Sequence, residues 1–289
     1  MHYKEYKTIL SPSNGMNIYR GCTHGCIYCD SRSKCYNMQH EFTDIEIKKD
    51  AAKILELELI KRGKPVQIGT GSMTDPYIHL EEKLQYTREC LKVISKYHCG
   101  VSIQTKSNRI LRDMDLLDEI NKKAKVVVEV TLTTADDELC KIIEPNVSPT
   151  SERVMILKKC KELGIKTVVW LCPFLPFIND TKENIKRLLD ICSENDVYGV
   201  LCFGIGLTLR EGNREYFYSK LDEHFPGLKE KYIKTYGNSY EVTSLHAKEL
   251  NRYLIDECNR RNIVCDNNKV FEFLRTYPKK YEQLSIFDI

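Results

Sequence analysis

The chain has 289 residues, of which 42% are hydrophobic and 29% charged, a balance typical of a globular protein rather than of a disordered or membrane-spanning one. Its 44 basic and 41 acidic residues leave a formal net charge of +3, which neither requires nor excludes a polyanionic partner. Residues 1–5 lack the apolar segment of a secretory signal, and no apolar stretch is long enough to span a membrane. We therefore expect a cytoplasmic protein without membrane contact.

Short β-branched runs alternate with longer amphipathic stretches between residue 16 and about residue 207. This alternation is typical of βα units around a parallel sheet. The expected strands are Met16–Tyr19, Val66–Gly69, Val101–Gln104, Val126–Leu132, Thr167–Leu171 and Gly199–Ile205. The expected helices are Ile45–Arg62, Glu81–Tyr97, Met114–Ala124, Ser151–Leu163 and Thr181–Asn195. The pattern predicts an α/β fold, a partial (β/α)6 TIM-like barrel.

Strand signals fade after Gly206, and residues 213–276 are predicted to be mostly helical. One apolar face of this region should pack on the barrel. Its members recur at helical spacing and are Val242, Leu245, Leu250, Tyr253, Leu254 and Cys258. We therefore expect a barrel core at 1–207, a helical C-terminal cap at 208–276 and a tail at 277–289.

Thirteen cysteines are present, an odd number that does not suit a disulfide scaffold in a chain of this length. Free cysteine often fills the role of a small buried hydrophobe. That role is predicted for Cys90, Cys140, Cys160, Cys192 and Cys258. A reducing compartment suits these residues and also the N-terminal cysteine group described next.

Three cysteines, Cys22, Cys26 and Cys29, follow the first expected strand with the spacing C-x3-C-x2-C. Active sites of α/β barrels lie on the loops after the strands. Three thiolates cannot saturate a [4Fe–4S] cluster, whose usual complement is four, so one iron would stay open. The open iron can accept the amino and carboxylate groups of a cosubstrate such as S-adenosylmethionine.

Two other interpretations of this cysteine group remain open. One is a zinc knuckle with His24 or Cys35 as fourth ligand, although zinc sites usually pair two half-sites and the sequence has no second one of that form. The other is a structural or electron-transfer cluster. Cys35 lies six residues beyond Cys29 and is expected to be a bystander.

The three-cysteine motif, with Tyr28 before its last cysteine, resembles the signature of the radical S-adenosylmethionine superfamily. Further segments resemble relatives of spore photoproduct lyase, often called DNA repair photolyases, over about residues 10–205. They are Gly71–Tyr77, Gln104–Ser107, Leu111–Leu117, Glu144-Pro145 and Pro173–Asp180. The resemblance implies the radical SAM type of partial barrel, a [4Fe–4S] cluster on Cys22, Cys26 and Cys29, and S-adenosylmethionine (SAM) as cosubstrate.

The resemblance also implies a binding site for SAM. Ser72 would approach its amino group, and Gly69 and Gly71 would leave room for the methionine moiety. Lys106 and Thr131 would bind its carboxylate and ribose hydroxyls. Tyr28 would flank the adenine, and Arg153 would reach a carboxylate. For several of these residues a structural role stays open. Lys106 would then be a solvated loop residue, and Arg153 would lie on an exposed helix face. Glu129 and Thr131 would only follow the alternation of side chains along a strand.

One departure from the family concerns its hydrogen donor. In spore photoproduct lyase a cysteine in the segment matching Gly71–Asp75 returns a hydrogen atom to the product, and this chain has Met73 there. Cys172 and Cys202, near the ends of the last two expected strands, are the candidate replacements, with buried packing as the alternative. We expect cleavage of SAM to a 5′-deoxyadenosyl radical that abstracts hydrogen from a nucleic-acid base. A peptide or small metabolite is the alternative substrate.

The C-terminal residues carry a second resemblance. Gln283, Leu284, Ile286 and Phe287 resemble the peptide by which bacterial replication and repair proteins dock on the sliding clamp, although these apolar residues would equally suit packing on the barrel. Upstream, Lys269, Arg275, Lys279 and Lys280 interleave with Phe271, Phe273, Tyr277 and Tyr281, a pattern for a nucleic-acid strip or for a helix with a solvated face. A flavodoxin- or ferredoxin-class electron donor is the other expected partner. A non-catalytic zinc or iron–sulfur protein bound to the clamp remains the competing hypothesis.

Overall fold

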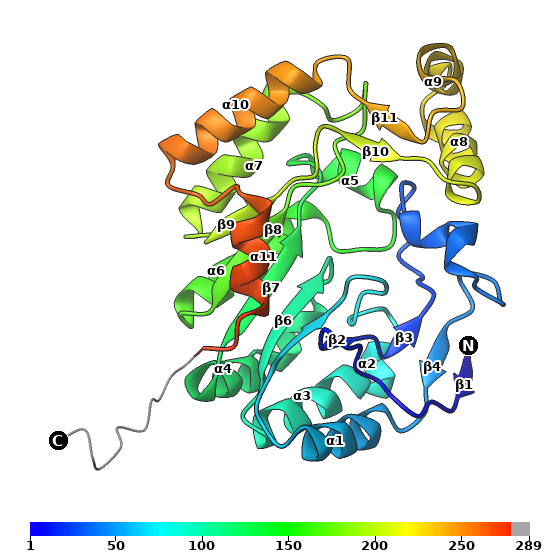
Figure 1. Ribbon diagram of the computed structural model, residues 1–289. Coiled ribbons are helices and arrows are strands. Elements are labelled where there is room, and N and C mark those ends of the chain that lie inside the picture. Colours follow the sequence, from blue (N-terminus) through cyan, green and yellow to red (C-terminus); the bar gives the residue numbers. More distant parts are fainter. Residues whose placement is uncertain (279–289) are drawn as a thin grey trace.

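A six-stranded parallel sheet forms the centre of the computed structural model, which describes residues 1–278 (Figure 1). The strands of this sheet lie side by side in the order of the chain, and the remaining strands belong to two smaller sheets. This order is expected for a partial barrel of βα units. The strands are β2 Gly15–Met16, β5 Gln67–Thr70, β6 Gly100–Thr105, β7 Val126–Thr131, β8 Lys166–Trp170 and β9 Gly199–Leu201. The predicted fold class is confirmed.

The central strands are buried on both faces, which explains their continuous apolar sequence. Every residue of β7 is buried. In the register of the sheet, Gln104 lies opposite Glu129, and Thr131 lies opposite Trp170. Polar side chains from neighbouring strands therefore meet toward the carboxyl ends of β6, β7 and β8.

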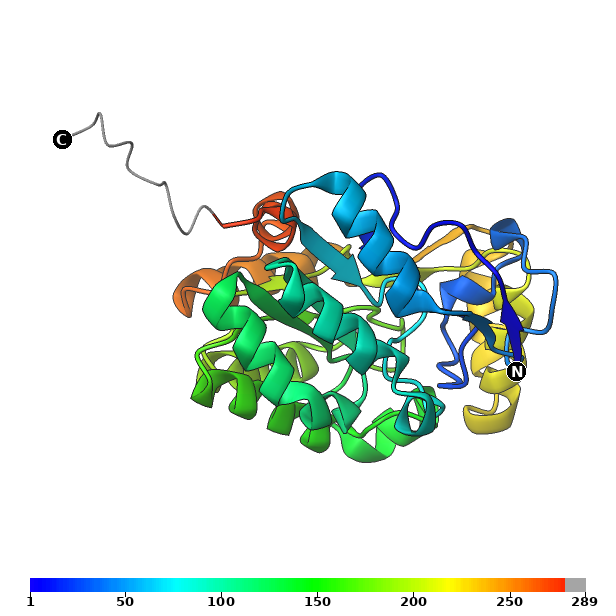
Figure 2. The ribbon, with the colours of Figure 1, turned by 90° about the horizontal axis from the view of Figure 1, so that it is seen from below.

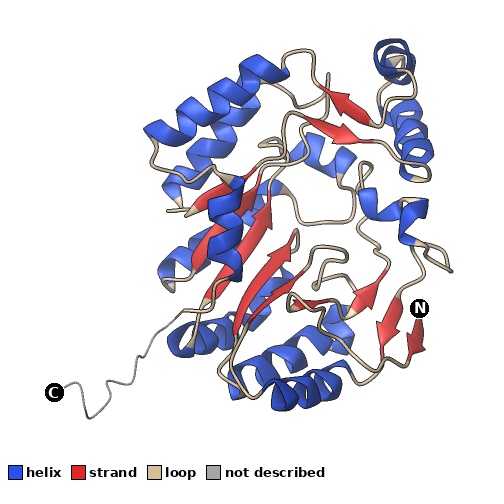
Figure 3. Cartoon of the chain, in the orientation of Figure 1, coloured by secondary structure: helices blue, strands red, loops and turns tan. Residues whose placement is uncertain are grey.

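Helices cover the outer face of this sheet (Figures 1 and 3). The helices that connect the strands are α1 Ala51–Arg62, α2 Glu81–Leu84, α3 Tyr86–Lys96, α4 Met114–Lys123, α5 Asp137–Ile143, α6 Thr150–Glu162 and α7 Lys182–Glu194. The single helix expected at Glu81–Tyr97 is two, because Gln85 adopts a left-handed conformation with φ 54° between them. The five cysteines predicted to be core residues are all buried.

A small second sheet near the N-terminus was not foreseen. It joins β1 His2–Lys4, β4 Glu46–Lys48 and β3 Tyr19–Arg20. The expected strand Met16–Tyr19 therefore splits between two sheets. The expected helix Ile45–Arg62 begins with a strand, because Asp50 takes a left-handed φ of 55° and α1 begins after it.

The region after β9 contains a strand pair as well as helices. The antiparallel pair is β10 Gly206–Thr208 with β11 Glu241–Thr243, and α8 Asn213–His224 and α9 Leu228–Tyr236 lie between them. Val242 is thus a strand residue, and Leu245 is 66% exposed, so the expected helical face is wrong for these two. Leu250, Leu254 and Cys258 of α10 Ala247–Arg260 do pack into the main core.

The last helix, α11 Asn267–Arg275, lies across the inner face of the sheet and contacts both β5 and β9 (Figures 1 and 2). Val270 and Leu274 pack with Val127, Val168 and Leu201 of the sheet. Ser102 Oγ donates a 2.7 Å hydrogen bond to the carbonyl of Leu274. This helix fills one end of the barrel interior. Among residues 1–278, no helix has the length and apolar character needed to cross a bilayer.

Candidate functional site

The three-cysteine loop follows β3 and is held on its outer side by the segment before β4. The amide of Cys22 donates a 2.9 Å hydrogen bond to the carbonyl of Phe42. Gly21 has φ +90°, and a Cβ there would lie 2.6 Å from that same carbonyl oxygen. Glycine is therefore required before the first cysteine.

The other side of the loop is held by residues 143–146, the turn after α5. The amide of Ile27 donates to the carbonyl of Ile143 at 3.0 Å, and the amide of Asn146 donates to the carbonyl of His24 at 3.1 Å. A Cβ on Gly25 would lie 3.2 Å from Pro145 Cγ. The turn that contains the Glu144-Pro145 motif therefore supports the cysteine loop, which is a structural role for this motif.

The cysteine loop fits the donor set of an iron–sulfur cluster. Cys22 and Cys26 are buried, Cys29 is half-buried, and none of the three is in a disulfide. Cys35, one proposed fourth zinc ligand, is exposed, and its Sγ lies 3.1 Å from Arg210 Nη1. His24, the other, is buried with Nδ1 3.6 Å from Asp75 Oδ2. The contact of Cys35 with Arg210 gives no support to Cys35 as a zinc ligand, whereas His24 Nε2 is buried without a hydrogen bond among the described residues.

A cavity of about 610 Å³ opens beside Cys29, a size suited to a cofactor with a small substrate. One wall is made by the carboxyl ends of the strands and the loops after them, and β10, β11 and residues 203–206 make another. Of the residues predicted from the sequence, it is lined by Tyr28, Cys29, Ser72, Lys106, Thr131 and Cys172. Residues as far apart in the sequence as Tyr28 and Cys172 therefore share one cavity.

Gly71 lets the loops after β5 and β6 come together. Its φ is +103°, and a Cβ there would lie only 2.2 Å from the carbonyl oxygen of Gln104. Asp75 ties the same two loops, since its carboxylate accepts hydrogen bonds from Thr105 Oγ1 at 2.8 Å and from the amide of Lys106 at 2.7 Å. Ser72 and Lys106 thus reach the cavity from one fixed junction.

Two groups in the cavity wall are suited to binding a ligand. Thr131 Oγ1 is buried without a hydrogen bond among the described residues, so a ligand or a water would supply its partner. Burial alone would lower the pKa of Lys106, but the negative charges of Cys26, Glu144 and Asp75 raise it overall. Lys106 is therefore a cation held ready for an anionic group.

The family model that matches this chain is that of the radical SAM superfamily, and it matches residues 16–192. The chain belongs to this superfamily. Radical SAM proteins use a [4Fe–4S] cluster and SAM, which are accordingly the cofactors of this chain. The matched segment contains the cysteine loop and the ends of β5, β6 and β7 that line the cavity.

Relatives of this radical SAM chain occur in distant organisms. An uncharacterized protein of Mycobacterium bovis is 29% identical over 229 residues, which cover 76% of this chain and 66% of the relative. One from Methanocaldococcus jannaschii is 33% identical over 169 residues, 58% of this chain and 62% of its own. The chain thus spans about two thirds of the length of these relatives.

Solved structures of spore photoproduct lyase share the fold. The structure of that enzyme complexed with dinucleoside spore photoproduct has a TM-score of 0.60 and 14% identity, covering 84% of this chain and 72% of the lyase. The structural likeness agrees with the family resemblance inferred from the motifs. At this identity it shows the fold of the partial barrel alone.

Arg153 does not line the cavity of this radical SAM protein, and it is not on an exposed helix face. Its side chain is fully buried and forms a 2.6 Å ion pair with Glu144. It also donates to the carbonyls of Ser148 at 2.7 Å and Thr131 at 2.9 Å. Glu144 in turn accepts from the hydroxyl of Tyr28. The expected contact of Arg153 with SAM stays a prediction without support from these contacts.

The two candidate hydrogen donors are placed differently. Cys172 lines the cavity. Cys202 does not, and its Sγ instead lies 3.6 Å from the carbonyl of Gly204. Met73, at the position of the family cysteine, is 37% exposed and also faces the cavity. Geometry therefore favours Cys172 over Cys202.

Sequence reasoning missed two aromatic residues of the cavity wall. Trp170 and Phe203 line the cavity with ring centroids 5.7 Å apart, and Phe203 is 60% exposed. Trp170 Nε1 donates a 2.7 Å hydrogen bond to Glu129, and burial raises the pKa of that carboxyl to about 7. Trp170 is the only tryptophan of the chain, and this was the one feature of the sequence that could have drawn attention to it.

The aromatic residues of the suspected nucleic-acid strip do not share one exposed face. Phe271 packs edge-on to Trp170, and Phe273 stacks on Tyr198 with centroids 3.9 Å apart. Lys279, Lys280 and Tyr281, together with the clamp-type residues Gln283, Leu284, Ile286 and Phe287, lie outside the described residues. The described part of the suspected strip therefore gives no support to nucleic-acid binding. The clamp-binding peptide stays a prediction.

Proposed function

We propose that this chain is an enzyme that cleaves SAM reductively at a [4Fe–4S] cluster on Cys22, Cys26 and Cys29 and abstracts hydrogen from a nucleic-acid base. The carrying observation is that the half-buried Cys29 opens directly into the 610 Å³ cavity where Ser72, Lys106 and Thr131 converge. When bound, the cluster and SAM supply the difficult radical step. The protein contributes binding, orientation and exclusion of water.

The residues of the cavity wall match the groups of SAM. Lys106 offers a cation to the carboxylate, and the unpartnered hydroxyl of Thr131 offers a hydrogen bond to the ribose. Ser72 lies beside them for the amino group. Tyr28 lines the same cavity and is oriented by Glu144, so it would flank the adenine while Arg153 acts as a positioning residue.

The cavity also suits a flat, unstacked substrate. Trp170, Phe203 and Tyr36 contribute aromatic rings to its wall, and stacking of a base on such rings is worth about 1–3 kcal/mol. The spore photoproduct lyase of similar fold was solved with a dinucleoside photoproduct. Both observations favour a nucleic-acid base, extruded from its stack at a cost of a few kcal/mol.

Cys172 is the proposed hydrogen donor. Its S–H bond would break as a C–H bond forms on the substrate radical, leaving a thiyl radical on Cys172. One electron from the flavodoxin- or ferredoxin-class donor and one proton would restore the thiol. Met73 cannot replace it, because a thioether has no S–H to give. This placement supports a reaction that differs from that of spore photoproduct lyase in its donor.

Isotope transfer tests the substrate class. Reconstituted protein is mixed with reductant, SAM and ultraviolet-damaged oligonucleotide whose bases and sugars carry deuterium, and the 5′-deoxyadenosine is analysed by mass spectrometry. Deuterium in the 5′-deoxyadenosine supports a nucleic-acid substrate. Abundant unlabelled 5′-deoxyadenosine with damaged and intact DNA alike would redirect the search to a peptide or small metabolite.

Clamp docking by the C-terminal residues is a separate proposal about location. Binding of purified sliding clamp to the full chain, and its loss when Leu284 and Phe287 are both changed to Ala, would support it. Unchanged binding by that double variant would contradict it. The radical chemistry does not depend on the result.

A further inference from the structure

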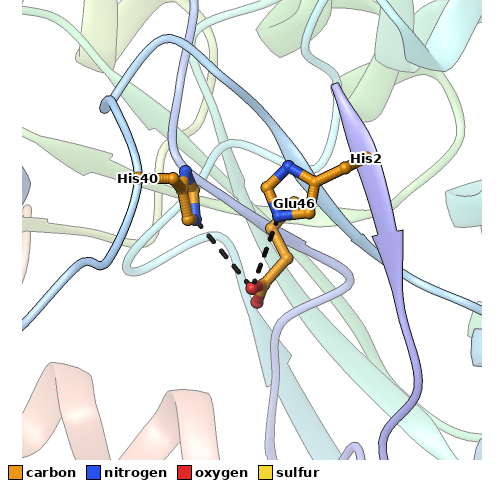
Figure 4. A group of neighbouring side chains, drawn as sticks. All are labelled: His2, His40 and Glu46. Carbon is orange, nitrogen blue, oxygen red and sulfur yellow. Dashed lines mark ion pairs between the residues drawn. The ribbon is translucent and has the colours of Figure 1, made fainter.

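Three side chains converge, two from the small N-terminal sheet and one from the segment before β4 (Figure 4). His2 lies on β1, His40 precedes β4 and Glu46 lies on β4. His2 Nε2 is 3.7 Å and His40 Nε2 is 3.9 Å from Glu46 Oε2. One ligand atom from each of the three lies within 4.8 Å of the other two.

The other ring nitrogen of each histidine is held by an oxygen atom. His2 Nδ1 lies 2.9 Å from Asp44 Oδ2, and His40 Nδ1 lies 3.0 Å from the carbonyl of Glu41. A carbonyl can only accept, so Nδ1 of His40 carries the hydrogen and its Nε2 keeps a lone pair when the ring is neutral. Metal-binding histidines are usually held in this way by a carboxylate or a backbone carbonyl.

His40 Nε2 supplies an independent sign of a missing partner. This atom is buried and makes no hydrogen bond with any described residue. A buried polar atom left without a partner is costly and calls for an unseen ion or water. The lone pair of His40 faces Glu46, whose side chain is only 3% exposed.

We propose that His2, His40 and Glu46 bind a divalent cation of the zinc class, with water in the remaining position. Zinc bonds of about 2.0–2.2 Å place tetrahedral ligand atoms about 3.3 Å apart. The three atoms here lie within 4.8 Å of one another, so a bound ion would draw them together by up to about 1.5 Å. Lys4 Nζ lies 3.0 Å from Glu46 Oε2 and is 52% exposed. The ion takes the place of this ammonium, which is free to turn into solvent.

The site would add a further link between two segments that already meet through the small sheet and through ion pairs. It joins β1 to residues 40–46, and the carbonyl of Phe42 within that segment accepts the amide of Cys22. A bound ion thus stiffens the outer support of the cysteine loop. The proposal stands on its own and does not depend on the reaction proposed above.

Zinc binding to the cluster-loaded protein tests the proposal, because the sulfur ligands are then occupied. The protein is prepared without a histidine tag, incubated with zinc alone, desalted and analysed for zinc and iron. The matched variants are His2→Gln and His40→Gln. The control is His224→Gln, whose Nε2 lies 3.4 Å from the exposed Glu223 and which has no third ligand among residues 1–278.

We expect on the order of one zinc per chain for wild type and His224→Gln, and an affinity at least about tenfold weaker for His2→Gln and His40→Gln, with iron unchanged. Cobalt in place of zinc should give a visible absorption band lost in the same two variants. Equal zinc in all four proteins, or none in wild type, overturns the proposal. If His40→Gln does not fold by circular dichroism, His2→Gln at the chain end decides alone.

Discussion

Arg153 and Glu144 form an ion pair of 2.6 Å in which neither side chain has any solvent exposure. Burial alone would raise the pKa of Glu144, but Arg153 and Lys106 hold it below its usual range. The pair lies between the end of β7 and the turn that supports the cysteine loop. A structural ion pair thus connects the end of β7 to the turn that supports the cysteine loop.

Arg153→Met should destabilise the fold by about 3–5 kcal/mol, because it leaves Glu144 as an uncompensated buried charge. Urea unfolding under anaerobic conditions measures the change. The double variant Arg153→Met/Glu144→Gln should recover part of the loss. Arg252→Met, at an exposed position on α10, is the control and should stay within about 0.5 kcal/mol of wild type. Equal effects of the two single arginine variants would contradict this role.

Lys106→Met should weaken SAM binding about 10- to 100-fold, since a charge-assisted hydrogen bond is worth about 1.5–3 kcal/mol. Equilibrium dialysis with labelled SAM on reconstituted protein measures the affinity, and iron content checks the cluster. Lys83→Met, at an exposed position on α2, provides the matched charge removal. An affinity in Lys106→Met equal to that of Lys83→Met would remove Lys106 from the site.

Thr131→Val should separate ligand binding from stability. The hydroxyl of Thr131 is buried without a partner, so its removal should leave the free energy of unfolding unchanged or raise it by about 1 kcal/mol. SAM affinity should nevertheless fall about fivefold, the equivalent of one hydrogen bond of about 1 kcal/mol. A loss of stability with unchanged SAM affinity would show that the hydroxyl serves the fold.

Glu129 should make stability depend on pH. Burial raises the pKa of Glu129 from its ordinary 4.5 to about 7. Between these values the folded state holds a proton that the unfolded state releases, so stability falls as pH rises. Glu129→Gln removes this penalty, which reaches about 3 kcal/mol. Urea unfolding at about pH 5 and about pH 8 measures the free energy of unfolding. The variant should be more stable than wild type at the higher pH only. A constant difference would contradict the raised pKa.

Much of the barrel could be predicted because its strands are continuous apolar runs with helices of clear period between them. Val126–Val130 of β7 is an example, since burial on both faces leaves little choice of residue. The small N-terminal sheet could not be predicted, because β1, β3 and β4 have two or three residues each. Such strands are defined by pairing between distant segments, which leaves no local period.

The candidate site divides in a similar way. Ser72, Lys106 and Thr131 could be placed together because the carboxyl ends of parallel strands meet at one edge. The ion pair of Arg153 with Glu144 could not be predicted, because helical spacing does not show which carboxylate elsewhere in the chain a side chain contacts. His2 and His40 escaped notice for the same reason, being 38 positions apart by their numbers in the sequence.

The central claim is that three cysteines hold the cluster at which SAM is cleaved. The decisive measurement is release of 5′-deoxyadenosine after anaerobic reconstitution and addition of dithionite and SAM. It compares wild type, the Cys22/Cys26/Cys29 triple alanine variant and Cys35→Ala. The account predicts iron binding and release of 5′-deoxyadenosine by wild type and Cys35→Ala, with neither in the triple variant. Equal release by wild type and the triple variant, or one tightly held zinc per wild-type chain with no release, would contradict it.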